Sequence, residues 1–171
     1  DENAEWEAMS QEDKQADISK RLSDVLAELL QYAQMPVGRM FILCSLLAQS
    51  QSLNDEQKER SRECEALYGF VGIGKPVDLD GFVPLLVKLA RGDGIADGQQ
   101  QPQLRQPAVG LIEALSDDAA FVQILKQVDG GEDLLPPCSV CLEPLDASIQ
   151  KDGEEAIVRT ECGHRFHQEC I

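Results

Sequence analysis

The chain has 171 residues, of which 15 are Lys or Arg and 31 are Asp or Glu, so its formal net charge at pH 7 is −16. A chain of this length accommodates one ordinary domain, or one domain and a small additional module, and excludes a large enzyme barrel. Its negative charge argues against partners that carry many phosphate groups, such as nucleic acids and anionic lipid surfaces. A hydrophobic fraction of 43% is typical of a globular protein that buries a core.

The N-terminal third predicts a polar leader and then two helices. The leader spans residues 1–16. From Ile18 to Ala33 the apolar residues recur at steps of three and four, which places them on one face of a helix. Pro36 and Gly38 are expected to end this helix. Residues 39–51 are apolar almost all round, which predicts a second helix enclosed by its neighbours.

Further helices are expected in the middle of the chain. A charged helix opens at the predicted cap Asn54, and Asp80 is the predicted cap of a helix over residues 81–91. Residues 92–104 are rich in Gly and Gln without an apolar period, which indicates a solvated loop. The apolar spacing then predicts helices over 106–115 and 117–128. These patterns together predict a mainly α domain over residues 17–131.

One part of this region resembles a known family. Residues 81–89, Gly-Phe-Val-Pro-Leu-Leu-Val-Lys-Leu, look like the third-helix consensus of an armadillo repeat, and residues 106–116 are similar to the helix that follows it. The resemblance spans residues 80–131 and implies an armadillo-like interaction domain. A solenoid requires at least three stacked repeats, and residues 17–79 contain no second copy at a fixed period. An armadillo-like domain and a plain helical bundle therefore both remain open.

Cysteine and histidine are concentrated near the C-terminus. Four of the six Cys and both His lie in the pattern Cys-x-x-Cys, twenty residues, then Cys-x-His-x-x-His-x-x-Cys. A helical core would scatter its thiols, so the clustering predicts a metal site. Thiolate and imidazole together favour tetrahedral zinc, whereas iron–sulfur clusters usually take four Cys and a disulfide framework would leave both His unexplained. The candidate zinc ligands are Cys138, Cys141, Cys162, His164, His167 and Cys170.

Spacing alone does not say which of these ligands share an ion. Their order resembles a RING finger of the two-histidine type, over Cys138 to Ile171, and residues 138–145 and 162–171 read like the start and the centre of that family. The resemblance implies two zinc ions in a cross-braced arrangement, with a final Cys-x-x-Cys pair expected downstream of Ile171. In that arrangement Cys138, Cys141, His167 and Cys170 hold the first ion, and Cys162 and His164 begin the second.

The predicted module covers residues 132–171. So short a segment carries too little apolar surface to fold alone, so its zinc is expected to be structural. Residues 156–160 predict a short strand that leads into the second group of ligands. Metal ligation rather than burial sets the backbone at Val140, whose side chain is therefore expected to be exposed as a docking contact. In the resembling family this position and that of Leu142 contact a ubiquitin-conjugating enzyme.

The RING resemblance implies a ubiquitin ligase, in which the zinc module recruits a ubiquitin-conjugating enzyme and residues 17–131 bind a protein substrate or partner subunit. No catalytic residue is expected in the chain, because a structural zinc with four protein ligands has no open position for water. Since the last ligand pair is expected downstream, residues 1–171 alone are expected to be weak or inactive as a ligase. The alternative is a non-enzymatic, armadillo-like interaction scaffold with a structural zinc module.

The sequence also bears on location. The longest apolar run, Met40–Ala48, is less than half of the ~20 residues that a membrane-spanning helix needs. The acidic first residues do not resemble a secretory signal. We therefore expect no membrane contact within this chain and a reducing, intracellular compartment, the cytoplasm or the nucleus.

Overall fold

The structure is a computed structural model, and it describes residues 6–49, 59, 81–94, 100–148, 157–161 and 164–171. Nearly all of the charged helix expected from Asn54, and the predicted cap Asp80, lie outside these ranges. The fold is mainly α with a small module at the C-terminus, as the sequence predicts. Its helices are α2 (Gln11–Gln34), α3 (Pro36–Gln49), α5 (Phe82–Ala90), α6 (Pro102–Leu115) and α7 (Ala119–Lys126), and its strands are β1 (Ile157–Arg159) and β2 (Arg165–His167), with the short 3-10 helices η1 (Glu132–Leu134) and η2 (Gln168–Cys170).

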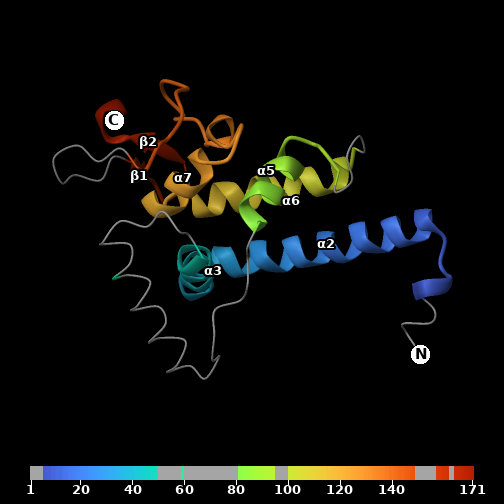
Figure 1. The fold of residues 1–171 in the computed structure, drawn as a ribbon. Coiled ribbons are helices and arrows are strands. Elements are labelled where there is room, and N and C mark those ends of the chain that lie inside the picture. The colour runs from blue at the N-terminus through green and yellow to red at the C-terminus, as the bar shows by residue number, and fades with distance from the viewer. Residues whose placement is uncertain (1–5, 50–58, 60–80, 95–99, 149–156, 162–163) are drawn as a thin grey trace.

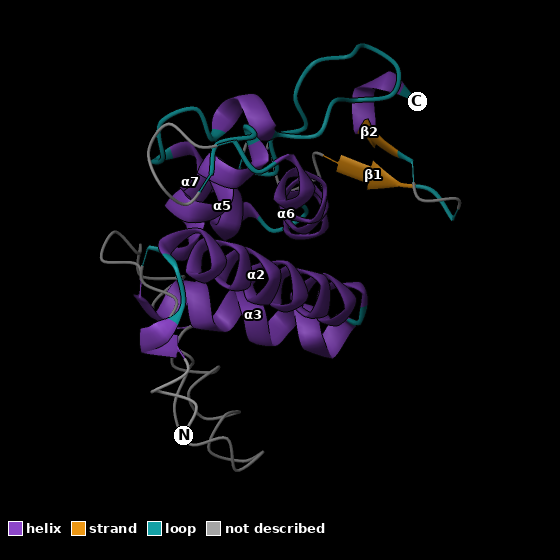
Figure 2. Ribbon diagram, turned by 90° about the vertical axis from the view of Figure 1, so that its right-hand side faces the viewer, coloured by secondary structure: helices purple, strands orange, loops and turns teal. Residues whose placement is uncertain are grey.

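The helices form two layers (Figure 1). The long helix α2 runs along the lower side of this view, and α5 and α6 lie together above it. Helix α3 is seen end-on, next to the C-terminal end of α2. The most extensive packing is between α2 and α6, followed by α5 with α6 and α2 with α3. The strand pair β1–β2 lies beside the end of the helical layers, near α6 (Figures 1 and 2). The C-terminal module therefore sits against the helical domain.

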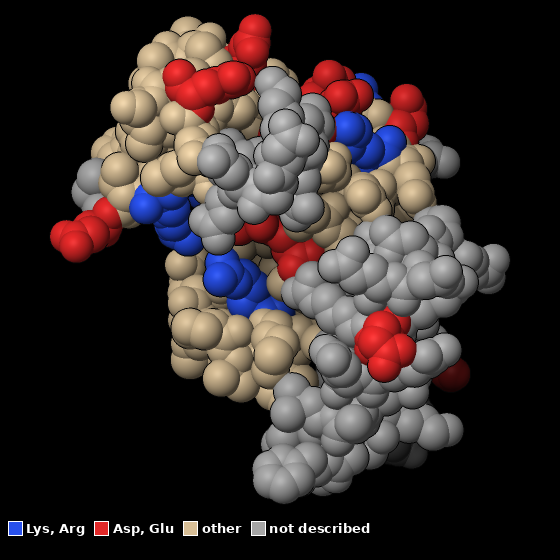
Figure 3. All heavy atoms as spheres, turned by 90° about the vertical axis from the view of Figure 1, so that its left-hand side faces the viewer, with Lys and Arg blue, Asp and Glu red and all other residues tan. Residues whose placement is uncertain are grey.

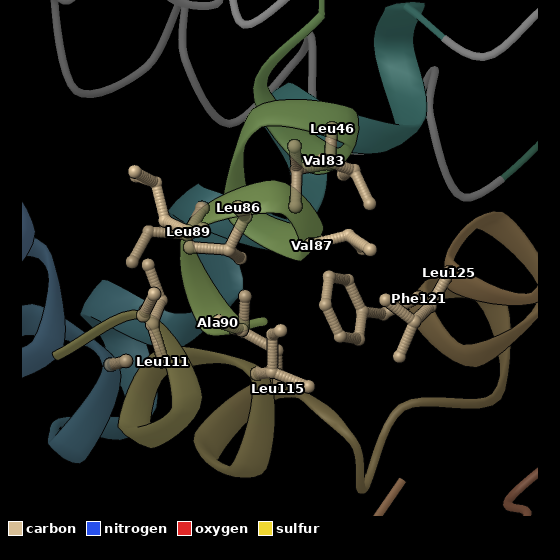
Figure 4. Packing of buried hydrophobic residues seen from close by; sticks show 14 of the residues in the cluster. Leu46, Val83, Leu86, Val87, Leu89, Ala90, Leu111, Leu115, Phe121 and Leu125 are labelled. Atoms are coloured by element: carbon tan, nitrogen blue, oxygen red, sulfur yellow. The ribbon is translucent and has the colours of Figure 1, made fainter. Parts of the chain in front are cut away.

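One continuous hydrophobic core joins all five helices. In Figure 4 the ring of Phe121 on α7 points toward Val87 and Leu115, which come from α5 and α6. The same core reaches Leu135, just after η1, so it extends past the predicted boundary at residue 131. Each fully buried Leu or Phe contributes about 1.5–3 kcal/mol of transfer free energy. The largest side chains without exposed surface are Leu26, Leu86, Leu89, Leu104, Leu111, Ile112, Leu115, Phe121, Val122, Leu125 and Leu145.

Helices α2 and α6 approach each other closely at Gly110. A Cβ atom at this position would lie 3.2 Å from a methyl group of Leu30 on α2. The missing side chain lets the two helices pack at short distance. This close approach is part of the extensive packing of α6 against α2.

The first helix starts earlier than the sequence predicts. α2 begins at Gln11, inside the expected leader, and the Ser10 side chain accepts a hydrogen bond from the Asp13 N–H as its N-cap. The expected stop at Pro36 is also the first residue of α3. Proline suits that position because the first residues of a helix have no intrahelical partner for their N–H groups. Two long helices thus meet across a single residue, Met35.

The predicted loop is partly helical. α6 begins at Pro102 rather than at residue 106 and includes Pro107, although an internal proline removes one helix hydrogen bond. Leu104 is fully buried in the core, so tertiary packing favours the helix where local composition favours a loop. At the start of α5 the N-cap position is taken by Gly81, whose φ of 71° is the left-handed conformation that glycine adopts readily.

Candidate metal centre

The strand pair brings the C-terminal ligands back toward the first Cys pair. β1 and β2 are antiparallel, with Ile157 opposite His167 and Arg159 opposite Arg165. The Ser139 N–H donates to the Arg165 carbonyl at 3.2 Å, which attaches the segment of the first Cys pair to β2. His167 at the end of β2 and Cys170 in η2 are thereby placed next to the first Cys pair.

A tight turn positions the two cysteines of the first pair. The Cys138 N–H donates to the Glu143 carbonyl at 2.8 Å, and the Leu142 N–H donates to the Cys138 carbonyl at 3.0 Å. The Cys138 sulfur also accepts the Val140 N–H at 3.4 Å. Cys138 is fully buried, whereas Cys141 is exposed. The loop from Cys138 to Glu143 is therefore held by its own backbone, and we call it the knuckle.

Four potential ligands meet in one place. The ligand atoms of Cys138, Cys141, His167 and Cys170 all lie within 4.8 Å of one another. His167 Nδ1 is 3.3 Å from the Cys141 sulfur and 3.8 Å from the Cys170 sulfur. Tetrahedral zinc with bonds of about 2.3 Å to sulfur and 2.0 Å to nitrogen would separate these atoms by about 3.6 Å. The donor types and their spacing fit a structural zinc ion.

A backbone carbonyl orients the histidine. His167 Nε2 lies 3.2 Å from the Pro144 carbonyl oxygen, on the side of the ring away from the sulfurs. With Nδ1 directed to the metal position, Nε2 carries the proton and donates to this carbonyl, which holds the ring in one orientation. Pro144 contributes through its backbone, so its side chain offers no sign of this role in the sequence.

The thiols of Cys138 and Cys170 differ in acidity because backbone N–H groups surround the first and neighbouring thiols surround the second. Burial raises the pKa of the Cys138 thiol, but hydrogen bonds from the N–H groups of Cys141, Val140 and His167 outweigh it and lower the pKa to about 6. Burial, and then contact with Cys141 and Cys138, raise the pKa of Cys170 to about 12. Three adjacent thiolates need a cation, and a bound metal supplies that charge when the thiols deprotonate.

The second predicted ligand pair is only partly placed. His164 is exposed at the start of β2 and is not one of the four clustered residues. The His164 carbonyl accepts two hydrogen bonds from Thr160, one from its N–H at 3.0 Å and one from the Thr160 hydroxyl at 3.2 Å. These bonds close the loop between the strands. Cys162 lies in that loop, outside the described residues. The pairing of Cys162 with His164 stays a prediction.

The two predicted docking residues are exposed on the knuckle. Val140 is 56% exposed and Leu142 is 74% exposed. Leu142 has a φ of 63°, and it is the only residue other than glycine with a positive φ among the described residues. This left-handed backbone costs a leucine about 1–2 kcal/mol. Neither burial nor backbone preference explains a leucine at this position.

Ion pairs that the sequence analysis missed hold the module to the helices. Lys126 at the end of α7 contacts Asp146 at 2.6 Å, and this contact raises the pKa of Lys126. Burial raises the pKa of Asp146, but hydrogen bonds from Lys126 and Ser148 outweigh it, so the net shift is downward. These partners are distant in sequence, and no local pattern marks them. The contact fixes the segment after the knuckle to the helical domain.

A second missed cluster surrounds Asp117, just before α7. Its carboxylate lies 3.5 Å from Arg39 Nη1, 3.3 Å from Arg159 Nη1 and 3.2 Å from Arg165 Nε. These arginines come from α3, β1 and β2. Burial lowers the pKa of Arg165; Asp117 raises it, and the neighbouring Arg159 and Arg39 lower it. We call these four residues the Asp117 cluster.

Comparison with known proteins agrees with the site. Residues 138–171 match the family of RING-type zinc fingers. No curated protein and no solved structure matches the chain. Among the described helices, none is both long enough and apolar enough to cross a bilayer. The C-terminal segment is therefore a RING-like, zinc-binding module attached to a mainly helical domain.

Proposed function

We propose that the protein is a RING-type ubiquitin ligase that recruits a ubiquitin-conjugating enzyme through the knuckle. The observation that carries this proposal is Leu142, an exposed leucine in an unfavourable backbone conformation beside a metal ligand. A residue retained against its conformational preference, without burial, points to a contact outside the chain. Val140, two residues earlier, is a second exposed apolar side chain on the knuckle.

The proposed ligand sets follow from the clustered residues and from the family match. Cys138, Cys141, His167 and Cys170 hold one zinc ion, and Cys162 and His164 belong to a second. Zinc would supply a rigid cross-link and no reactive water, because all four positions of the first site are taken by protein ligands. The chain's own contribution to transfer is to hold the charged conjugating enzyme near an acceptor lysine, which accelerates the reaction through proximity.

In this proposal residues 17–131 bind a protein substrate or partner subunit, and residues 132–171 bind the conjugating enzyme. Support for the first part comes from α2, where Ile18, Val25 and Tyr32 are spaced seven residues apart and are 39%, 48% and 46% exposed. Residues at this spacing lie on one helix face. Because this face suits a protein partner with or without ligase activity, the scaffold remains the second candidate function.

The test is direct binding of the zinc-loaded chain to a panel of ubiquitin-conjugating enzymes, measured by calorimetry. We expect at least one enzyme to bind, and Leu142→Asn to weaken binding at least about tenfold through loss of an apolar anchor. Asparagine tolerates the left-handed backbone, so this variant keeps the fold. The matched control is Val37→Asn on α3, which removes a side chain that is 61% exposed in the helical domain.

Two outcomes would count against the ligase. One is that no conjugating enzyme binds a chain whose zinc content is normal. The other is that Leu142→Asn and Val37→Asn leave binding equally unchanged. Absence of binding together with self-association of the chain would favour the scaffold.

A further inference from the structure

A cavity of about 570 Å³ lies where the RING-like module meets the helical domain. Its walls come from the end of α2, the start of α3, the C-terminal half of α6, the segment before the knuckle, and both strands. This volume is within the range of pockets that bind small ligands. In Figure 3, basic side chains lie on the face of the molecule that carries the module, with acidic side chains beside them.

The charged side chains that line this cavity are mainly cationic. Arg39, Arg159 and Arg165 all line it, and they are the three arginines of the Asp117 cluster. Each guanidinium places one nitrogen within 3.5 Å of the single Asp117 carboxylate. An arginine has five N–H donors, so most of the donors in the cluster are not used by Asp117. Among the described residues, Asp117 Oδ1 accepts no well-aligned hydrogen bond, so Arg165 does not direct its donors fully at this carboxylate.

Arginines outnumber carboxylates on the wall of the cavity. The lining contains three arginines and one carboxylate, that of Glu113, and the Asp117 carboxylate lies against the three guanidinium groups. Asp118 adds a third carboxylate nearby; it accepts the N–H groups of residues 120 and 121 as the cap of α7 and is not among the lining residues. Three arginines on one wall are notable in a chain with a net charge of −16. Arg165, at 12% exposure, is also largely withdrawn from water, which strengthens its interaction with any anion that enters.

We propose that this cavity binds a phosphoryl group, carried by a phosphorylated side chain of a partner or by a small phosphate ester. A phosphoryl group offers three acceptor oxygens, which match guanidinium groups that converge from three elements. Arginine pairs with phosphate through two parallel N–H bonds, and clusters of arginine are a recurrent way to recognise phosphorylated peptides. This binding requires neither transfer of ubiquitin nor contact with a conjugating enzyme.

The experiment uses the zinc-loaded 171-residue chain and three probes: inorganic phosphate, the capped peptide Gly-phosphoserine-Gly, and its unphosphorylated counterpart. Binding is followed by NMR on the arginine Nε–H signals. We expect a phosphorylated probe to bind with a dissociation constant of roughly 1 mM or lower, and we expect no detectable binding of the unphosphorylated peptide. Tighter binding of the phosphopeptide than of phosphate identifies a modified side chain as the source, and the reverse order identifies a small phosphate compound.

Variants connect the binding to the cavity. Arg39→Gln should weaken binding at least about tenfold, because it removes a charged donor that is not part of the strand pair. Arg39→Lys, which keeps the charge but loses the paired donors, should be intermediate. Arg21→Gln is the matched control: it removes the same charge from an exposed arginine on α2, about 18 Å along the helix from the cavity residue Ala33, and should change affinity less than twofold.

Asp117→Asn tests whether the internal carboxylate competes with the phosphoryl group for the three arginines. Removal of the internal carboxylate should tighten binding of phosphate, because fewer negative charges compete for the three guanidinium groups. The proposal is overturned if Arg39→Gln and Arg21→Gln weaken binding equally, or if no phosphorylated probe binds. It is also overturned if Asp117→Asn abolishes binding while zinc content and melting temperature stay at their original values.

Discussion

The helical domain and the RING-like module are stabilised in different ways. Among the described residues, nineteen buried residues form one cluster, which comes from α2, α3, α5, α6 and α7 and ends along the chain at Leu135. In the described part of the module after Leu135, only Cys138 and Leu145 are buried hydrophobic residues. The first region can therefore fold by removing apolar surface from water, whereas the second depends on its metal ligands. The comparison shows how one chain combines two sources of stability.

The largest expected effect comes from removing zinc. We expect about one tightly held zinc ion per 171-residue chain, and its removal by a chelator, or the variant His167→Ala, should unfold the module. Structural zinc contributes on the order of 10–16 kcal/mol in small zinc domains. The measurement is zinc content together with the NMR signals of β1 and β2. The NMR signals of α2 and α6 should persist. If they were lost together with the signals of the strands, the helical domain would also depend on zinc.

The reverse experiment deletes packing in the helical domain. Phe121→Ala should reduce the free energy of unfolding by about 3–5 kcal/mol, because it leaves a cavity between α5, α6 and α7. Thermal unfolding followed by circular dichroism measures the loss. Zinc affinity of the folded protein should change little, since the four clustered ligands come from other segments. A large fall in zinc affinity would show that the two regions are not separate sources of stability.

A smaller effect is expected where the two regions meet. The pKa of Asp146 is lowered in the folded protein, so its pair with Lys126 stabilises the fold above the ordinary carboxyl value of 3.8 and loses this effect as the pH falls below it. Asp146→Asn should cost about 1 kcal/mol near neutral pH and almost nothing at acidic pH. Urea unfolding from about pH 3 to 7 measures this.

The Asp146→Asn variant and the original chain both release zinc at low pH. The difference between their free energies of unfolding therefore isolates the contribution of the ion pair. A difference that stayed constant with pH would mean that the ion pair does not hold the regions together. Lys126→Met provides a second route to the same loss.

The smallest expected effect is a gain in stability. Leu142→Gly should leave the protein as stable or up to about 1 kcal/mol more stable, because glycine adopts a φ of 63° without the steric cost that leucine bears. Chemical denaturation, followed through the module, measures this. A loss of more than about 1 kcal/mol would show that the Leu142 side chain supports the fold, and the argument for a docking role would then fail.

Some core positions on regular helices were predictable, whereas other positions and some element boundaries were not. Ala33 and Leu26 lie on the apolar stripe predicted over residues 18–33, and both are buried, but Ile18 and Val25 of the same stripe are 39% and 48% exposed. The start of α6 at Pro102 was missed because burial of Leu104, which no local pattern reveals, favours helix in a segment that reads as a loop. Residue composition indicates which secondary structure a segment prefers by itself, and burial of a side chain in the core can override that preference.

The same division applies to the site. Candidate ligands follow from residue type and spacing, because zinc selects thiolate and imidazole where they recur in a compact pattern. The Pro144 carbonyl that orients His167 and the three arginines around Asp117 could not be read in this way. A carbonyl is present in every residue, and surface charges carry no mark of their partners.

The sequence by itself determined that the chain is mainly helical and that its tail holds candidate zinc ligands, because these depend on side-chain chemistry at short range. Only the tertiary structure decided that α3, α7 and the strand pair meet at the Asp117 cluster, with an arginine-lined cavity beside it. Contacts between distant segments depend on how whole elements pack, and packing is a property of the complete core rather than of any local pattern.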